Sequence, residues 1–95
     1  SWMKMNSVYY MSMNSYEVYI LKCADESLYI GITTNLERRL AEHNLSKRGA
    51  KYTKARRPVE LVYSEKYETR GVASKREYEL KQLTRQQKID LYTSK

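Results

Sequence analysis

Four side chains that can move protons or hold ions stand where a small fold could bring them together. The first two are Tyr19 and Tyr29, ten residues apart in two segments rich in β-branched and aromatic residues that a short turn joins. A hairpin of these segments would place the two rings close in space. Each ring alone is typical of a core tyrosine whose hydroxyl finds a partner. Gly31, two residues after Tyr29, indicates either a special backbone conformation or the close approach of another group.

The other two are Arg39 and Glu77, each on the inward-facing stripe of a predicted helix. Arg39 is three residues after Leu36 and four before His43, whereas Arg38 points elsewhere. A carboxylate that faces a sheet must be paired, hydrogen-bonded or bound to a cation. Glu77 therefore forms a salt bridge with Arg39 or a lysine, or it binds a hard cation. A single carboxylate, joined by waters and a phosphate, suits Mg²⁺.

Several kinds of site are excluded by composition. The chain has one cysteine, Cys23, and one histidine, His43, so it cannot form an internal disulfide, a cysteine-rich zinc site or a histidine cluster. Three glycines supply no Gly-rich phosphate loop. No apolar run approaches the roughly 20 residues that span a bilayer. We expect a soluble, cytoplasmic domain with no membrane partner.

The positive charge lies entirely in the C-terminal half. Residues 1–46 hold four basic and five acidic groups, a net charge of −1, and residues 47–95 hold fourteen basic and six acidic groups, a net charge of +8. We define the basic stretch as Lys47, Arg48, Lys51, Tyr52, Lys54, Arg56 and Arg57. Such a run is either a solvated face or an electrostatic footprint for a polyanion, and nucleic acid is the leading partner. Anionic lipid is disfavoured because no amphipathic apolar face accompanies the run.

The elements that must position these side chains follow a simple order. The pattern predicts strands over 16–23, 28–32 and 59–67, and helices over 35–45, 70–83 and 85–92. Capping boxes are predicted at Thr34 with Glu37 and at Thr84 with Gln87. The order β-β-α-β-α-α predicts an α+β fold in which helices flank a three-stranded sheet.

Residues 1–15 are rich in Met, Ser, Asn and Tyr and lack a sustained period. We expect them to form a mobile extension, either native or left over from cloning, with Val8–Met11 as a weaker candidate for an edge strand. Residues 16–95 are then expected to form a single domain.

The sequence motifs of this chain, and their order, resemble those of the GIY-YIG nuclease family. The resemblance is carried by Glu17-Val-Tyr19, Tyr29-Ile-Gly31, Asn35 to Arg39 and Glu77, and it covers about residues 16–92. The middle of the chain, from Gly49-Ala-Lys-Tyr-Thr53 through Arg56-Arg-Pro58 to Leu61-Val-Tyr63, is similar to one branch in particular. That branch contains small single-domain members and the nuclease domain of junction-resolving, structure-specific endonucleases.

The resemblance implies a GIY-YIG-like antiparallel sheet and a metal-dependent endonuclease. Tyr19 or Tyr29 would help to deprotonate the attacking water, and Arg39 would hold the scissile phosphate. Glu77 would ligate a single Mg²⁺ or Mn²⁺, and His43 would lie near the phosphate. The turn Ala-Asp-Glu-Ser before Leu28 lacks the glycine that is common there in the family, so we expect it to cost some stability.

The implied substrate is DNA that is branched, flapped or single-stranded, with RNA as a further candidate. The basic stretch would contact backbone phosphates without reading sequence, and a protein partner could supply targeting. The alternative is a nucleic-acid-binding module that is non-catalytic or works only with a partner. A third alternative is a structural or protein-interaction domain, which salt dependence distinguishes because phosphate binding weakens steeply with added salt.

Overall fold

A three-stranded antiparallel sheet of order β2-β1-β3 forms the centre of the protein, and the predicted α+β fold is confirmed. The computed structural model describes residues 15–45 and 48–94. The helices and strands are β1 Tyr16–Lys22, β2 Leu28–Thr33, α2 Leu36–Leu45, α3 Lys51–Lys54, β3 Glu60–Tyr67, α4 Arg70–Lys81 and α5 Arg85–Thr93. Residues 1–14 of the predicted extension, with its candidate edge strand, and Lys47 lie outside the described residues. Within the described ranges, no helix is long and apolar enough to cross a membrane.

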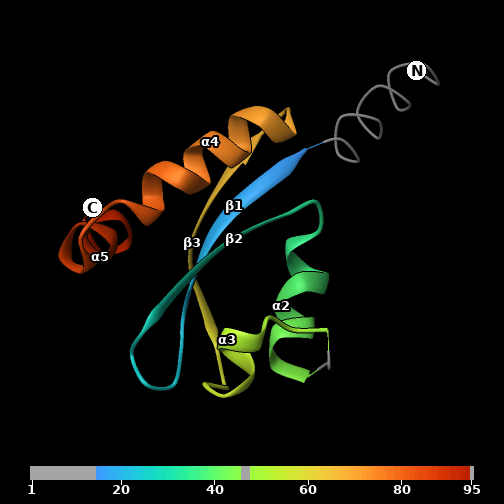
Figure 1. Ribbon diagram of the computed structural model, residues 1–95, viewed down its shortest axis with the longest axis vertical. Coiled ribbons are helices and arrows are strands. Elements are labelled where there is room, and N and C mark those ends of the chain that lie inside the picture. Colours follow the sequence, from blue (N-terminus) through green and yellow to red (C-terminus); the bar gives the residue numbers. More distant parts are fainter. Residues whose placement is uncertain (1–14, 46–47, 95) are drawn as a thin grey trace.

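Helices cover both faces of the sheet, with α4 and α5 on one side and α2 and α3 on the other (Figure 1). The central strand serves both sides because successive side chains of a strand point to opposite faces. Val18 and Ile20 enter the core that Ala73 and Leu80 of α4 complete. The opposite core contains Tyr19, Leu21, Cys23 and Val59, with Leu36 and Leu40 of α2 packed against it. Each large apolar side chain fully buried in this way contributes about 1.5–3 kcal/mol.

The helix ends are set by capping side chains. The predicted capping box at Thr84 and Gln87 is confirmed, with the Thr84 hydroxyl 3.1 Å from the Gln87 amide nitrogen. The box predicted at Thr34 is wrong, because Asn35 caps α2 and its Oδ1 accepts the Arg38 N–H at 3.0 Å. Asparagine satisfies the exposed amides of a first helical turn as well as threonine does.

The turn between β1 and β2 places a residue other than glycine in the left-handed region. Glu26 has a φ of 71°, a conformation that costs an L-residue about 1–2 kcal/mol. Asp25 offsets part of this cost, since its Oδ1 accepts the Ser27 N–H at 3.0 Å. The absence of glycine from this turn therefore has the local cost that the sequence predicted.

A charged cluster fastens α4 to β3. The Arg76 guanidinium donates to both Glu65 carboxylate oxygens, from Nε at 2.8 Å and from Nη2 at 3.0 Å, and the Tyr63 and Tyr67 hydroxyls donate to the same carboxylate. Although burial opposes it, these donors hold the pKa of Glu65 down at about 2. Arg76 directly precedes Glu77 in the chain, so the cluster also fixes the part of α4 that carries the candidate metal ligand.

Candidate active site

The ring of Tyr19 lies directly over Gly31. Tyr19 is 1% exposed on the central strand, and Gly31 is its partner in β2. A Cβ at position 31 would stand 2.4 Å from the Tyr19 hydroxyl oxygen, which is far inside van der Waals contact. Of the two reasons considered for this glycine, the structure shows the close approach, because only a hydrogen fits under the ring.

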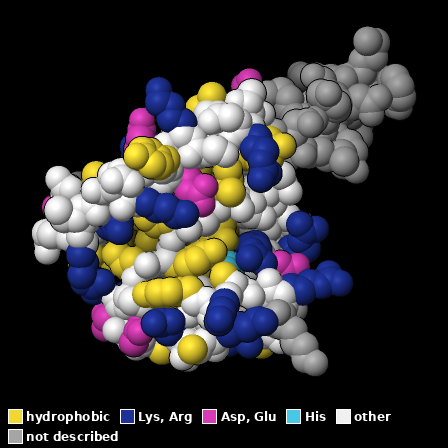
Figure 2. Space-filling model, in the orientation of Figure 1, with side chains coloured by type: hydrophobic (Ala, Val, Ile, Leu, Met, Phe, Trp, Pro, Cys, Tyr) yellow, Lys and Arg dark blue, Asp and Glu magenta, His cyan; other side chains and the backbone are white. Residues whose placement is uncertain are grey.

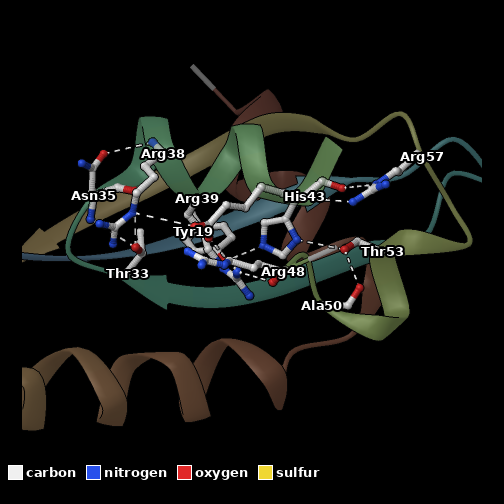
Figure 3. A network of polar contacts seen from close by, with 11 residues as sticks. Tyr19, Thr33, Asn35, Arg38, Arg39, His43, Arg48, Ala50, Thr53 and Arg57 are labelled. Carbon is white, nitrogen blue, oxygen red and sulfur yellow. Dashed lines mark hydrogen bonds and ion pairs between the residues drawn. The ribbon is translucent and has the colours of Figure 1, made fainter. Parts of the chain in front are cut away.

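A chain of hydrogen bonds runs from Tyr19 through His43 to Thr53 (Figure 3). The Thr53 hydroxyl donates its only hydrogen to the Ala50 carbonyl at 3.0 Å, so it must accept a hydrogen bond from His43 Nδ1 at 2.9 Å. This assignment leaves the lone pair on His43 Nε2, which accepts the Tyr19 O–H at 2.9 Å. His43 is thus held as the neutral tautomer with its proton acceptor aimed at Tyr19.

The surroundings keep this pair uncharged at neutral pH. Burial, followed by the positive charge of Arg39, lowers the pKa of His43 from 6.5 to about 4. Burial raises the pKa of Tyr19 from 10.0 to about 12, although the Arg39 guanidinium opposes the rise. The proton therefore rests on the phenol, beside a base that can receive it.

Tyr29 belongs to the same cluster. Its ring centroid is 6.5 Å from that of Tyr19 and 5.2 Å from that of His43, edge-on to the imidazole. On the outer side it stacks with Tyr52, with the ring centroids 6.1 Å apart and the planes inclined by 28°. The structure thus brings the two motif tyrosines together, Tyr19 in the core and Tyr29 partly open to solvent.

Arg39 lies beside this pair on α2. Its Nη1 donates to Glu42 Oε1 at 3.0 Å and to the Arg48 carbonyl at 2.9 Å, and its side chain is 26% exposed. Arg38 on the same helix is 63% exposed. Arg39 is thus held near the phenol with part of its guanidinium accessible, while Arg38 points into solvent as expected.

Glu77 lies half-buried on the sheet-facing stripe of α4, between Ala73 and Leu80. Its ion pair is with Lys81 Nζ at 3.3 Å, and Arg39 pairs with Glu42 instead. Of the two salt bridges considered for Glu77, the structure contains the one with lysine. The negative charge of Glu77 also contributes to the raised pKa of Tyr19, which places this carboxylate in the field of the phenol.

The donor set fits a single hard cation held mainly by its substrate. In the part of the chain that the structure describes, no three His, Cys, Asp or Glu side chains gather as a metal site. Mg²⁺ is commonly bound by one or two carboxylates together with waters and substrate phosphates. Glu77 supplies one half-buried carboxylate whose charge acts on the Tyr19 phenol, and one carboxylate is enough for that pattern, so Glu77 could hold Mg²⁺ or Mn²⁺.

The basic stretch divides into inward and outward groups. Arg48, Lys51 and Lys54 are exposed. Arg57 instead turns inward, and its guanidinium donates to the carbonyls of His43 and Glu42 at the end of α2. Arg56 lies over the Tyr52 ring at 3.9 Å and pairs with Asp25 at 3.0 Å.

Two side chains that support the site were not predicted from the sequence. Thr53, which is fully buried, fixes the His43 tautomer. Asn44 joins α2 to the start of β3, since its amide donates to the Val59 carbonyl at 3.0 Å and accepts the Val59 N–H at 2.8 Å. Neither residue follows a periodic pattern, and only the return of the chain along α2 brings their partners to them.

The buried neutral imidazole predicts a specific loss of stability in acid. Between pH 6.5 and pH 4 the unfolded chain protonates His43 and the folded protein does not, so the free energy of unfolding falls as the pH falls through this window. The loss amounts to about 3 kcal/mol at about 1.4 kcal/mol per pH unit. Urea unfolding at pH 7.5 and pH 4.5 measures it.

His43→Gln is the matched variant, because its amide can accept from Tyr19 and donate to Thr53 without titrating. Its unfolding free energy is expected to change little between the two pH values. Glu65 contributes little to this difference, since the stability it provides is lost mainly as the pH falls from 4.5 to about 2, and the same loss occurs in His43→Gln. Equal pH dependence in the wild type and His43→Gln would show that His43 is not the titrating group.

A tyrosine pair on a three-stranded sheet, with arginine and glutamate on the flanking helices, defines the class of this protein. The family model described as the GIY-YIG catalytic domain matches residues 15–90, and the chain belongs to the GIY-YIG family. That membership implies endonuclease activity. Among curated proteins, the chain is 56% identical over 79 residues to the UPF0213 protein SH2523 of Staphylococcus haemolyticus, a match that covers 83% of this chain and 95% of that protein.

Two solution NMR structures share the fold and the sequence pattern. The UPF0213 protein BH0048 from Bacillus halodurans is 43% identical with a TM-score of 0.52, and the match covers 81% of each chain. The protein EF2693 from E. faecalis is 46% identical with a TM-score of 0.56, and the match covers 83% of this chain and 84% of that one. This chain is therefore similar to small proteins of nearly its own length.

Proposed function

We propose that this protein is a divalent-metal-dependent endonuclease that hydrolyses phosphodiester bonds in DNA, with residues 16–95 acting as a single domain. The observation that carries the proposal is the Tyr19–His43 hydrogen bond of 2.9 Å beside Arg39. Membership of the GIY-YIG family supports the reaction class. A purely structural core would not need a neutral imidazole aimed at a phenol next to a partly exposed guanidinium.

The proposed proton path begins at the attacking water. The phenol passes its proton to His43 Nε2, and the phenol oxygen takes a proton from the water as the water oxygen bonds to phosphorus. The bond from phosphorus to the leaving oxygen breaks, and the leaving oxygen is protonated by solvent. Tyr19 alone, with a pKa of about 12, is a poor base at neutral pH. His43, whose pKa is about 4, is itself a weak base, so the transfer requires positive charge beside the phenolate. The Arg39 guanidinium and a divalent cation held by Glu77 would supply that charge and lower the pKa of the phenol.

Arg39 and Glu77 would supply the charges that a phosphodiester requires. The Arg39 guanidinium is permanently cationic and can donate two hydrogen bonds to phosphate oxygens as negative charge builds in the transition state. Glu77 would hold Mg²⁺ or Mn²⁺, and such a cation, when bound, polarises the phosphoryl oxygen and stabilises the leaving oxygen. Exposed Arg48, Lys51 and Lys54 would contact flanking phosphates of branched, flapped or single-stranded DNA.

Glu77→Gln tests the proposal directly. We expect cleavage of a labelled panel of single-strand, duplex, flap and four-way-junction DNA, with matching RNA, to require Mg²⁺ or Mn²⁺ and to stop in EDTA. Glu77→Gln is expected to lower the cleavage rate by about 100-fold or more, which is the scale of losing one electrostatic group at a transition state. Denaturing gels at saturating enzyme measure both effects.

Glu79→Gln is the matched control, because Glu79 is an exposed glutamate on the same helix whose ion pair is with Arg76 at 3.4 Å. Its cleavage rate is expected to stay within twofold of the wild type. Cleavage that continues in EDTA, or that survives Glu77→Gln, would contradict the proposal. Salt-sensitive gel shifts without cleavage would favour the non-catalytic or partner-dependent binding module instead.

A further inference from the structure

A pocket of about 240 Å³ opens beside the candidate active site. Its walls come from β2, α3, α4 and α5, and its lining residues are Leu28, Tyr29, Ile30, Tyr52, Lys81 and Lys88. This volume is below the roughly 300–1,000 Å³ of pockets for drug-sized ligands, so it suits a group about the size of one nucleobase. In Figure 2, a band of hydrophobic side chains crosses the middle of the same face, with Lys and Arg side chains on both sides of it.

The aromatic wall of the pocket is held rigid. Tyr52 is 40% exposed, yet the Arg56 guanidinium lies over its ring at 3.9 Å and Arg56 Nη1 donates to the Tyr52 carbonyl at 2.8 Å. Asp25 holds Arg56 in turn at 3.0 Å, and Tyr29 stacks beside Tyr52. A rigid aromatic surface binds a planar group with little loss of side-chain entropy.

The opposite wall is cationic. Lys88 of α5 is half-buried, and among the described residues it forms no salt bridge. Lys81 ends α4 and pairs with Glu77 at 3.3 Å, so the pocket borders the candidate metal ligand. A half-buried lysine that lines the same pocket as two tyrosines suits a ligand that is planar at one end and anionic at the other, as a nucleotide is.

We propose that this pocket binds one unpaired nucleobase next to the scissile phosphate, with its own phosphate on Lys88 and Lys81. This inference rests on the proposed function, since it names the part of the nucleic acid that enters the site. A base inside a duplex is stacked on both faces and cannot reach the rings, whereas a base in a single strand, a flap or a branch point can. Because Tyr29 contacts both the pocket and His43, the bound base would place its neighbouring phosphate near Arg39.

The test measures base stacking without cleavage. In EDTA, a short single strand carrying one 2-aminopurine is titrated with the whole protein, and the affinity and the fluorescence quenching are recorded. Tyr52→Leu is expected to lose about 10-fold in affinity, within the range for one stacking aromatic, together with the quenching. Tyr52→Trp is expected to restore both. Lys88→Gln is expected to lower the slope of log affinity against log salt by about one.

Tyr78→Leu and Lys75→Gln are the matched controls, because both residues are exposed on the outer face of α4. Both variants are expected to bind as the wild type does. If Tyr52→Leu binds and quenches as the wild type does, and the cleavage panel is still cut, the pocket does not bind a base. The proposed nuclease activity would be unaffected by that result. Quenching that depends on Tyr52, with no strand cut in Mg²⁺ or Mn²⁺, would establish the pocket and overturn the nuclease. Strands of DNA and RNA with the same sequence identify the preferred sugar.

Discussion

Arg39→Ala is expected to lower the rate of phosphodiester cleavage by about 10³-fold while leaving binding of nucleic acid within a few-fold. A single preorganised donor to a developing oxyanion is worth about 10²–10³ in rate, and an arginine on a phosphoryl transition state about 10³–10⁵. The Arg39 guanidinium is close enough to Tyr19 to lower the pKa of its phenol. The other arginine of α2, Arg38, points into solvent and cannot replace it. Single-turnover cleavage rates with saturating enzyme measure the loss.

Arg38→Ala is the control for this prediction, since Arg38 is the adjacent arginine and its side chain is 63% exposed. Its cleavage rate is expected to stay within twofold of the wild type. Arg39 also donates to the Arg48 carbonyl, so the melting temperature of each variant must be recorded. A folded Arg39→Ala protein that cuts at the wild-type rate would contradict the role assigned to Arg39.

Tyr19→Phe is expected to lower the cleavage rate by about 10²–10⁴-fold, the usual contribution of a general acid or base. The phenyl ring still packs over Gly31, so the fold is kept. The variant leaves the buried His43 Nε2 without its hydrogen-bond donor, which costs about 1–3 kcal/mol of stability. Cleavage rates are therefore compared well below the melting temperature of the variant.

Tyr29→Phe separates the two motif tyrosines. Tyr29 packs edge-on against His43 but does not hold the hydrogen bond that links a phenol to the imidazole. We expect Tyr29→Phe to lower the cleavage rate by about 10-fold or less. We attribute this loss to poorer placement of the substrate rather than to proton transfer. A larger loss in Tyr29→Phe than in Tyr19→Phe would assign the base to Tyr29.

The sheet and the long helices could be predicted because their signals are local. The β-branched and aromatic residues of Tyr16–Lys22 are neighbours in the chain. The two residues of the α5 capping box are only three positions apart. Helix α3 was missed because four residues give no period, and its N-cap Ala50 offers no side-chain hydrogen bond. Val72 lies at helical spacing with Ala73 and Leu80, yet it is 53% exposed, since α4 turns only one narrow face to the sheet.

The candidate site follows the same division between local and distant signals. The spacing of Tyr19 and Tyr29 predicts a hairpin, which the structure contains. Gly31 left open a special backbone conformation or a close approach, and the structure shows the close approach. The partners of His43 could not be predicted, because Thr53 reaches it through a helix that the sequence did not reveal. Arg57 is a residue whose contacts the sequence could not predict. Composition groups it with the other cations, and only the fold shows that it binds the carbonyls at the end of α2.

The order of strands also governs when the protein can act during its own synthesis. Tyr19 on the central strand pairs with Ser64 of β3, 45 positions later in the chain, and Glu77 follows later still. A ribosome adds about 5–20 residues per second. The tyrosines and Arg39 are therefore synthesised seconds before β3 is available to pair with the second edge of β1. A nascent chain that ends at Tyr67 has neither the metal ligand nor the α4 half of its core. The proposed active site is therefore completed only when α4 docks on the sheet.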